Sequence, residues 1–139
     1  MGDAVRILLV EDNAGDVFLV RRALEKQGLR HQLTVAHNGE EAMRLLEQAE
    51  KGPATQAPEL VLLDLNLPKV DGGQILSHIR HTYAFAATPV IIITSSDSPA
   101  DRDRALSLGA NVYFRKPTDL SSFMRLGGVV EQFAPRQAT

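Results

Sequence analysis

Two short segments of the chain are apolar at every position, and they limit the folds that are open to it. Leu60–Leu63 and Val90–Ile93 contain only leucine, valine and isoleucine. Runs of this kind are typical of parallel strands whose two faces are both covered by helices. The run Val90–Ile93, like the run Val5–Val10, is far too short to cross a bilayer. The sequence therefore predicts a buried parallel sheet.

The remaining strands and helices alternate along the chain. Val5–Val10, Gln32–Ala36 and Asn111–Phe114 are predicted strands, and Gln32–Ala36 is polar enough for a sheet edge. Five helices are predicted from apolar residues at helical spacing or from capping signals: one from Val17, Val20 and Leu24, one from Ala42, Leu45, Leu46 and Ala49, one from Ile75, Leu76 and Ile79, one starting at Ser98–Asp101, and one starting near Asp119. Five strand–helix units in this order predict a doubly wound, mostly parallel α/β sheet.

Bulk properties exclude several classes of function. We expect residues 1–139 to form a single domain with no output domain, because 139 residues leave little room for a second core. A net charge of −2 without any basic run argues against nucleic-acid binding. There is no cysteine, and the start Met1–Ala4 lacks the features of a signal peptide. We therefore expect a soluble, cytoplasmic protein that binds no membrane.

Two local features have competing interpretations. His78 and His81 lie one helical turn apart, a spacing that suits metal ligands, but two polar residues on an exposed helix face are the simpler interpretation. Gly127 and Gly128 fall in the middle of the predicted last helix, where each costs about 1 kcal/mol relative to alanine. That helix is either kinked or frayed there, or another backbone packs closely against it.

Polar residues follow the ends of four predicted strands. In a sheet of this class, sites form at the carboxyl ends of the strands, near the point where the strand order reverses. If the strand order is 2-1-3-4-5, strands one, three, four and five are neighbours and their end residues converge on one edge. These residues are Glu11 and Asp12, Asp64, Thr94 and Ser95, and Lys116 and Pro117.

The chemistry of this set follows from its charges. Clustered carboxylates repel one another, and a divalent cation such as Mg²⁺, which prefers oxygen ligands, removes the conflict. A carboxylate beside that cation can attack a phosphoryl group as a nucleophile. Asp64 is the best nucleophile candidate because it ends the central strand. Asp12 is the best direct ligand, Glu11 binds directly or through water, and the backbone carbonyl of Asn66 is a further candidate ligand.

The chain resembles a response-regulator receiver domain from about Arg6 to Phe133. The resemblance rests on five matching segments: Ile7–Asn13, Leu63–Pro68, Asp71–Gly72, Ile93–Ser95 and Lys116–Pro117. Asp12–Val17, Asn66–Gly72 and the long loop before the third strand resemble the stand-alone receivers that partner phytochrome-type sensor kinases. The resemblance implies a flavodoxin-like, chemotaxis-receiver-like (βα)5 fold with strand order 2-1-3-4-5.

The resemblance also implies roles for individual residues. Asp64 is the phosphoacceptor, and Glu11, Asp12, Asp64 and the Asn66 carbonyl hold Mg²⁺. Thr94 and Lys116 bind phosphoryl oxygens, and the Lys116–Pro117 bond is expected to be cis. Thr94 and Tyr113 form the conformational switch, in which Tyr113 turns inward once Thr94 has moved toward the phosphate. Asn66 and Ser96 are expected to influence the rate of autodephosphorylation.

The implied partners are proteins. A sensor histidine kinase or phosphotransfer protein supplies the phosphoryl group in a two-component phosphorelay. The face made by the fourth helix, fifth strand and fifth helix changes its partner preference, and a homodimer through it is compatible with the sequence. Such a protein is no enzyme beyond its own phosphoryl transfer and autodephosphorylation.

Three alternatives remain open from the residues. The first is a pseudo-receiver that binds its partner without phosphorylation, although the intact acid set argues against it. The second is a phosphatase acting on exogenous substrates, but Asn66 stands where a second acid is needed, and no cap insertion is present. The third is a flavin protein, whose phosphate the acidic loop after the first strand would repel unless a metal intervened.

Overall fold

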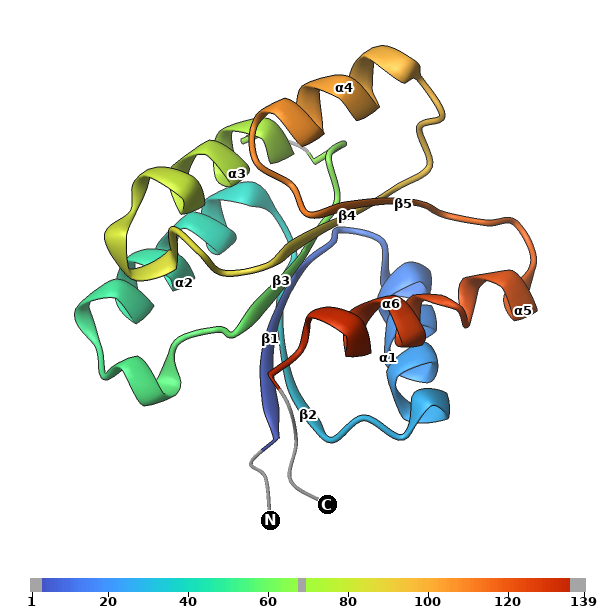
Figure 1. Ribbon diagram of the computed structural model, residues 1–139, viewed down its shortest axis with the longest axis horizontal. Helices are drawn as coiled ribbons and strands as arrows, with labels where there is room; N and C mark the ends of the chain where they lie inside the picture. Colours follow the sequence, from blue (N-terminus) through green and yellow to red (C-terminus); the bar gives the residue numbers. More distant parts are fainter. Residues whose placement is uncertain (1–3, 68–69, 136–139) are drawn as a thin grey trace.

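The computed structural model describes residues 4–67 and 70–135. Five strands form one parallel sheet in the order β2-β1-β3-β4-β5, which confirms the predicted topology (Figure 1). The strands are β1 (Val5–Val10), β2 (His31–Ala36), β3 (Leu60–Leu63), β4 (Val90–Thr94) and β5 (Val112–Arg115). The partly polar strand β2 lies at one edge, as its sequence predicts.

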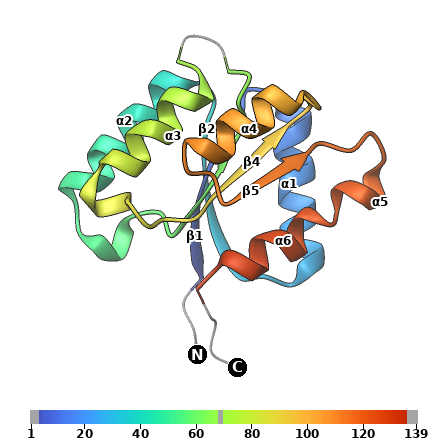
Figure 2. The same ribbon diagram turned by 45° about the horizontal axis from the view of Figure 1, so that its top comes forward.

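Helices cover both faces of the sheet. Figure 2 shows α2 (Gly39–Lys51), α3 (Gly72–His81) and α4 (Pro99–Ser107) on one side. The other side carries α1 (Ala14–Gln27), α5 (Leu120–Phe123) and α6 (Leu126–Phe133). Two short 3-10 helices, η1 (Ala54–Gln56) and η2 (Tyr83–Phe85), lie in the loops before β3 and β4. Among the described residues, no helix is both long and apolar enough to cross a membrane.

Alternate residues of each central strand contribute to separate cores. In β3, Val61 and Leu63 pack with α2 and α3, whereas Leu60 and Leu62 pack with α1, α5 and α6. All four residues are buried. Because successive side chains of a strand point to opposite faces, a continuously apolar strand is what two covered faces require.

Capping residues fix where the helices start, and these starts lie beside the strand ends. Asn13 accepts a hydrogen bond from the backbone of Asp16, and Asn38 accepts one from that of Glu41. Asp71 and Gln74 form a complete capping box at α3. Ser98 and Asp119 cap α4 and α5. Such side chains satisfy amide groups that the first turn of a helix leaves unpaired.

The predicted single last helix is wrong in one respect, because the structure divides it into α5 and α6. Arg125 and Gly127 donate to the carbonyls three residues earlier, so the chain tightens between the two helices. Gly127 then lies against α1, where a Cβ atom would stand 2.4 Å from the carbonyl oxygen of Ala23. Of the two alternatives for the glycine pair, close packing of another backbone is confirmed at Gly127. The interruption lies two residues earlier, at Met124–Arg125, and both glycines are helical within α6.

Candidate functional site

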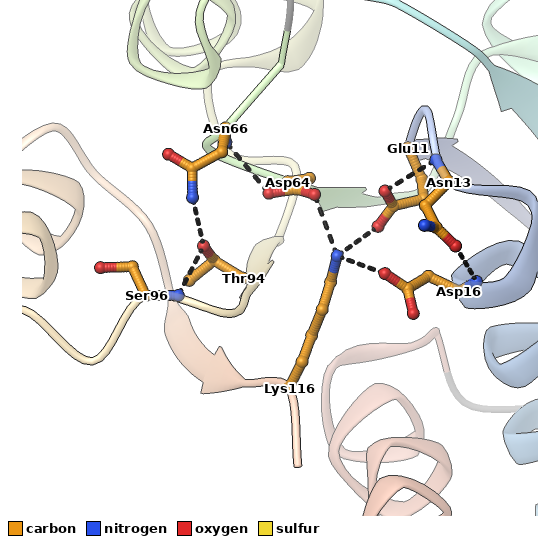
Figure 3. A network of polar contacts seen from close by, with 8 residues as sticks. All are labelled: Glu11, Asn13, Asp16, Asp64, Asn66, Thr94, Ser96 and Lys116. Carbon is orange, nitrogen blue, oxygen red and sulfur yellow. Dashed lines mark hydrogen bonds and ion pairs between the residues drawn. The ribbon is translucent and has the colours of Figure 1, made fainter. Parts of the chain in front are cut away.

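The carboxyl ends of the strands bring the predicted polar residues to one edge of the sheet. Glu11 and Asp12 follow β1, Asp64 follows β3, Thr94 ends β4, and Lys116 follows β5. Figure 3 shows Lys116 reaching across this edge toward Asp64 and Glu11. The parallel direction of the strands is the cause, since all of them end at the same side of the sheet.

Three carboxylates form the acidic group of this site. Glu11, Asp12 and Asp64 each offer an oxygen, and these oxygens lie within 4.8 Å of one another. Glu11 and Asp64 are buried, whereas Asp12 is exposed. Burial raises the pKa of Glu11 to about 7, despite the opposing effect of Lys116 beside it. Ionised carboxylates are therefore costly in this group unless a cation compensates them.

Lys116 is the cation that balances this charge. Its Nζ atom lies 2.7 Å from Glu11 Oε1, 2.8 Å from Asp16 Oδ2 and 3.0 Å from Asp64 Oδ2. Burial lowers the pKa of Lys116, but its contacts with the three carboxylates raise it more, so the net pKa is above its usual value. Lys116 is thus held as an ammonium ion that donates hydrogen bonds to Asp16 and Asp64 and forms an ion pair with Glu11.

Asp16 was missed by the sequence reasoning. It lies in the first turn of α1, directly after β1, and it contacts Lys116 across 100 residues of sequence. The sequence contained a signal for this position. With Asn13 as the cap, Asp16 is the third residue of the helix, and side chains of a helix tilt toward its N-terminus. Such an acid lies near the edge where β1 ends.

The acidic group fits a divalent cation. Its ligands are hard carboxylate oxygens, which Mg²⁺ and similar ions prefer. Glu11 Oε1 is buried and near Lys116 Nζ, yet among the described residues no well-aligned hydrogen-bond donor reaches it. A cation would satisfy this atom. The ligand role of the Asn66 carbonyl stays a prediction.

Hydrogen bonds connect Asp64 to the end of β4. The backbone N–H of Asn66 donates to Asp64 Oδ1 over 3.0 Å. The side-chain amide of Asn66 donates to Thr94 Oγ1, and the backbone N–H of Ser96 donates to the same oxygen, each over 3.2 Å. Thr94 is buried. Its hydroxyl oxygen therefore accepts two hydrogen bonds beside the carboxylate of Asp64.

The predicted switch tyrosine lies close to this network. Tyr113 is half-buried in β5, and its hydroxyl donates to the backbone carbonyl of Ser96 over 3.0 Å. Ser96 also donates to Asp101 in the first turn of α4 over 2.6 Å. The loop between β4 and α4 thus connects Thr94, Tyr113 and α4.

The expected cis bond before Pro117 is wrong in this structure. None of the described peptide bonds is cis, so Lys116–Pro117 is trans. The backbone N–H of Lys116 donates to the carbonyl of Thr94 over 2.7 Å, which continues the β4–β5 pairing up to the proline. Trans is the lower-energy form of such bonds, by about 0.5–1 kcal/mol.

Other residues named from the sequence have structural roles or lie elsewhere. Asp71 caps α3, and Gly72 lets the start of that helix approach the carbonyl oxygen of Asp64. Pro68 and Lys69, within the motif Asn66–Gly72, are outside the described residues. Among the described side chains, the single metal-ligating group of three or more is the acidic group, so His78 and His81 join no such cluster.

Comparisons with known proteins show which family the chain resembles. Residues 7–126 match the family described as the response regulator receiver domain. The probable methanogenesis regulatory protein FilR2 of Methanothrix harundinacea is 37% identical over 131 residues, covering 94% of this chain and 84% of FilR2. The response regulator Rcp1 of Synechocystis is 34% identical over 127 residues, covering 91% of this chain and 86% of Rcp1.

Solved structures give the same result. The phosphorylated cyanobacterial phytochrome response regulator RcpA superposes with a TM-score of 0.83 at 32% identity, over 96% of this chain and 99% of RcpA. The Mn²⁺-bound form of Rcp1 superposes with a TM-score of 0.82 at 32% identity, over 97% of this chain and 99% of that chain. The fold predicted from the sequence is therefore confirmed both by the strand order and by these neighbours.

Proposed function

The chain belongs to the response regulator receiver domain family, and from this premise we propose that Asp64 accepts a phosphoryl group in a Mg²⁺-dependent reaction. The donor is a phosphohistidine of a sensor kinase or of a phosphotransfer protein. The observation that carries the proposal is the position of Asp64, a buried carboxylate held between Lys116 and the backbone of Asn66 beside two further acids.

Asp64 is oriented for attack by contacts to both of its oxygens. Oδ1 accepts from the Asn66 backbone, and Oδ2 accepts from Lys116. Asp64 follows β3, which lies between β1 and β4, and both of these strands carry site residues at their ends. Glu11 and Asp12 follow β1, which has a strand with site residues on one side only. A nucleophile fixed in one rotamer loses little entropy when the reacting atoms meet.

Glu11, Asp12 and Asp64 are the proposed Mg²⁺ ligands, with the Asn66 carbonyl completing the protein's share. The fit of their oxygens and the Mn²⁺-bound form of the relative Rcp1 support this assignment. When bound, the cation neutralises charge on the phosphoryl oxygens.

The transfer step balances without a further reactant. An oxygen of Asp64 forms a bond to phosphorus while the bond from phosphorus to the donor imidazole nitrogen breaks, and the imidazole leaves with that electron pair and takes a proton. Lys116 offers an ammonium proton to one phosphoryl oxygen, and the hydroxyl of Thr94 donates to another. Hydrolysis later returns Asp64 to a carboxylate, so the chain catalyses only its own modification.

The proposed output is a change of conformation around β4 and β5. Thr94 moves toward the phosphoryl group, and Tyr113 follows into the vacated space, which alters the surface of α4, β5 and α5. The present contacts of Thr94 with Asn66 and of Tyr113 with Ser96 are the ones that must rearrange. We propose that this surface binds protein partners in the cytoplasm and that a second copy of the chain is one of them. Similarity to RcpA supports a phytochrome-type kinase as the donor.

Intact mass after incubation with acetyl phosphate and Mg²⁺ tests the proposal. Wild type is expected to gain one phosphoryl group, EDTA is expected to prevent the gain, and Asp64→Asn is expected to show none. Asp71→Asn is the matched control, because Asp71 is an exposed helix cap nearby and asparagine also caps well. Absence of any gain in wild type, together with no response to beryllofluoride, would contradict the proposal and favour a phosphorylation-independent pseudo-receiver.

A further inference from the structure

Asp16 differs from the other carboxylates that contact Lys116. Glu11 and Asp64 belong to the acidic group, but Asp16 does not. The Asp16 side chain is 26% exposed, compared with 0% for Glu11 and 7% for Asp64. Lys116 is therefore held by two carboxylates inside the site and by one at its rim.

Lys116 and a divalent cation compete for the same oxygens. The Nζ atom lies 2.7 Å from Glu11 and 3.0 Å from Asp64, both of which supply oxygens to the acidic group. An ammonium ion and a divalent cation repel each other strongly when they share ligands at such distances. Uptake of the cation therefore requires Lys116 to weaken its contacts with Glu11 and Asp64.

We propose that Asp16 is a positioning residue that retains Lys116 at the rim when a divalent cation occupies the acidic group. This inference rests on the metal site of the proposed function. Asp16 is the carboxylate partner of Lys116 that the cation leaves free. With that partner kept, the ammonium stays close to Asp64, where a phosphoryl oxygen will arrive.

The energetic reason is the burial of Lys116. Its side chain is only 10% exposed, so losing two carboxylates without keeping a third would leave a poorly solvated charge. Asp16 removes that cost from the metal-loaded form. Asp16 therefore strengthens cation binding by more than the direct attraction between its carboxylate and the cation.

A simpler role makes a different prediction. As an acid in the first turn of α1, Asp16 also interacts favourably with the helix dipole and attracts cations through space. Those effects do not depend on Lys116, whereas the proposed role disappears when the lysine is absent. A double-mutant cycle between the two residues separates the alternatives.

The experiment is a calorimetric titration of the full chain with Mg²⁺. The proteins are wild type, Asp16→Asn, Lys116→Met and the double variant. We expect Asp16→Asn to weaken Mg²⁺ binding by roughly three- to tenfold, the range of a coupled ion pair. In the Lys116→Met background, the fold loss of Mg²⁺ affinity caused by Asp16→Asn is expected to be at least about threefold smaller than in wild type.

Asp97→Asn is the control for net charge. Asp97 follows β4, its side chain is 73% exposed, and its partner Arg115 precedes Lys116 in the chain. We expect this variant to change Mg²⁺ affinity by less than about twofold, because exposed charges are well screened. An equal loss from Asp16→Asn in both backgrounds, or tighter binding, would overturn the inference and leave the phosphorylation proposal standing. Wild type that takes up no Mg²⁺ would overturn both.

A structure of the wild type with Mg²⁺ provides a second test that needs no variant. The expected result is that Lys116 keeps its ion pair with Asp16 while its contacts with Glu11 and Asp64 lengthen. A lysine that leaves Asp16 but stays on Glu11 would overturn the inference. This measurement is decisive even if Lys116→Met proves too unstable to titrate.

Discussion

At the scale of single residues, the site depends on one positive charge among four carboxylates. Lys116 contacts Glu11, Asp16 and Asp64, and Asp12 stands beside them. Breaking a buried ion pair is costly because the remaining partner keeps its charge without compensation. Lys116 therefore has a structural role in the metal-free protein as well as its proposed role toward the phosphoryl group.

Lys116→Met is expected to destabilise the metal-free protein. The free energy of unfolding should fall by about 3 kcal/mol, because Glu11 and Asp64 are buried and would lose their shared cation. Urea denaturation in EDTA measures the change. Arg115→Met is the matched control, because the ion pair of Arg115 with Asp97 is exposed and its loss is expected to change stability by less than about 0.5 kcal/mol. Equal effects of the two substitutions would contradict this account.

Asp119 gives a prediction about acid pH. Hydrogen bonds from the backbone of Ser122 and the hydroxyl of Ser121 hold the pKa of Asp119 below its usual value of 3.8. A group with a lowered folded pKa contributes stability above its unfolded pKa, and the contribution is lost as pH falls through the folded pKa. Asp119→Asn keeps a capping side chain that does not titrate. The stability difference between wild type and variant should therefore shift in favour of the variant below about pH 4, as measured by thermal unfolding across pH. A constant difference would contradict the prediction.

At the scale of elements, the contact between α1 and α6 depends on one glycine of a pair. A Cβ atom on Gly127 would meet the Ala23 carbonyl at 2.4 Å and the Gln27 Cβ at 2.8 Å. A Cβ atom on Gly128 would meet only the Gln27 side-chain oxygen, at 3.8 Å. The two positions are adjacent in sequence but differ completely in the space around them.

Alanine substitutions at the pair are expected to have opposite effects. Gly127→Ala should lower the free energy of unfolding by roughly 2 kcal/mol, because it forces α6 away from the backbone of α1. Gly128→Ala should raise it by up to about 1 kcal/mol through helix propensity alone. Chemical denaturation of both variants measures the difference. Two changes of the same sign would show that the crossing of α1 and α6 is looser than the structure indicates.

At the scale of the whole molecule, the site joins segments that are distant in sequence. Residues from the ends of β1, β3, β4 and β5 meet at one edge, so a bound cation would bridge the loop after β1 to the loop after β3. A ligand that binds only the folded state stabilises the entire fold, because unfolding disperses its ligands.

Mg²⁺ is therefore expected to stabilise the chain against unfolding. At a free concentration of 100 times its Kd, the gain should be about 2.7 kcal/mol. Thermal unfolding with Mg²⁺ and with EDTA measures it, and Asp64→Asn should show a much smaller gain because one carboxylate ligand is weakened. An unchanged unfolding temperature in wild type across millimolar Mg²⁺ would contradict the proposed metal site.

The sequence by itself determined the architecture and most members of the site. Continuous apolar runs at Leu60–Leu63 and Val90–Ile93 encode burial on both faces, and strand–helix alternation then leaves few topologies. Parallel strands end on one side of a sheet, so acids and a lysine at those ends had to gather there. The caps Asn38 and Ser98 followed from local hydrogen bonding, which neighbouring residues decide.

The tertiary structure alone decided which of these side chains touch. Lys116 contacts Asp16 across 100 residues and Asp64 across 52, and such pairings depend on how the strand ends are placed in space. The division between α5 and α6 and the contact of Gly127 with Ala23 depend in the same way on the crossing of two helices. The periodicity of apolar residues predicts whether a residue is buried. It does not predict which residues distant in sequence it contacts, because those contacts depend on how the helices and strands pack in the folded chain.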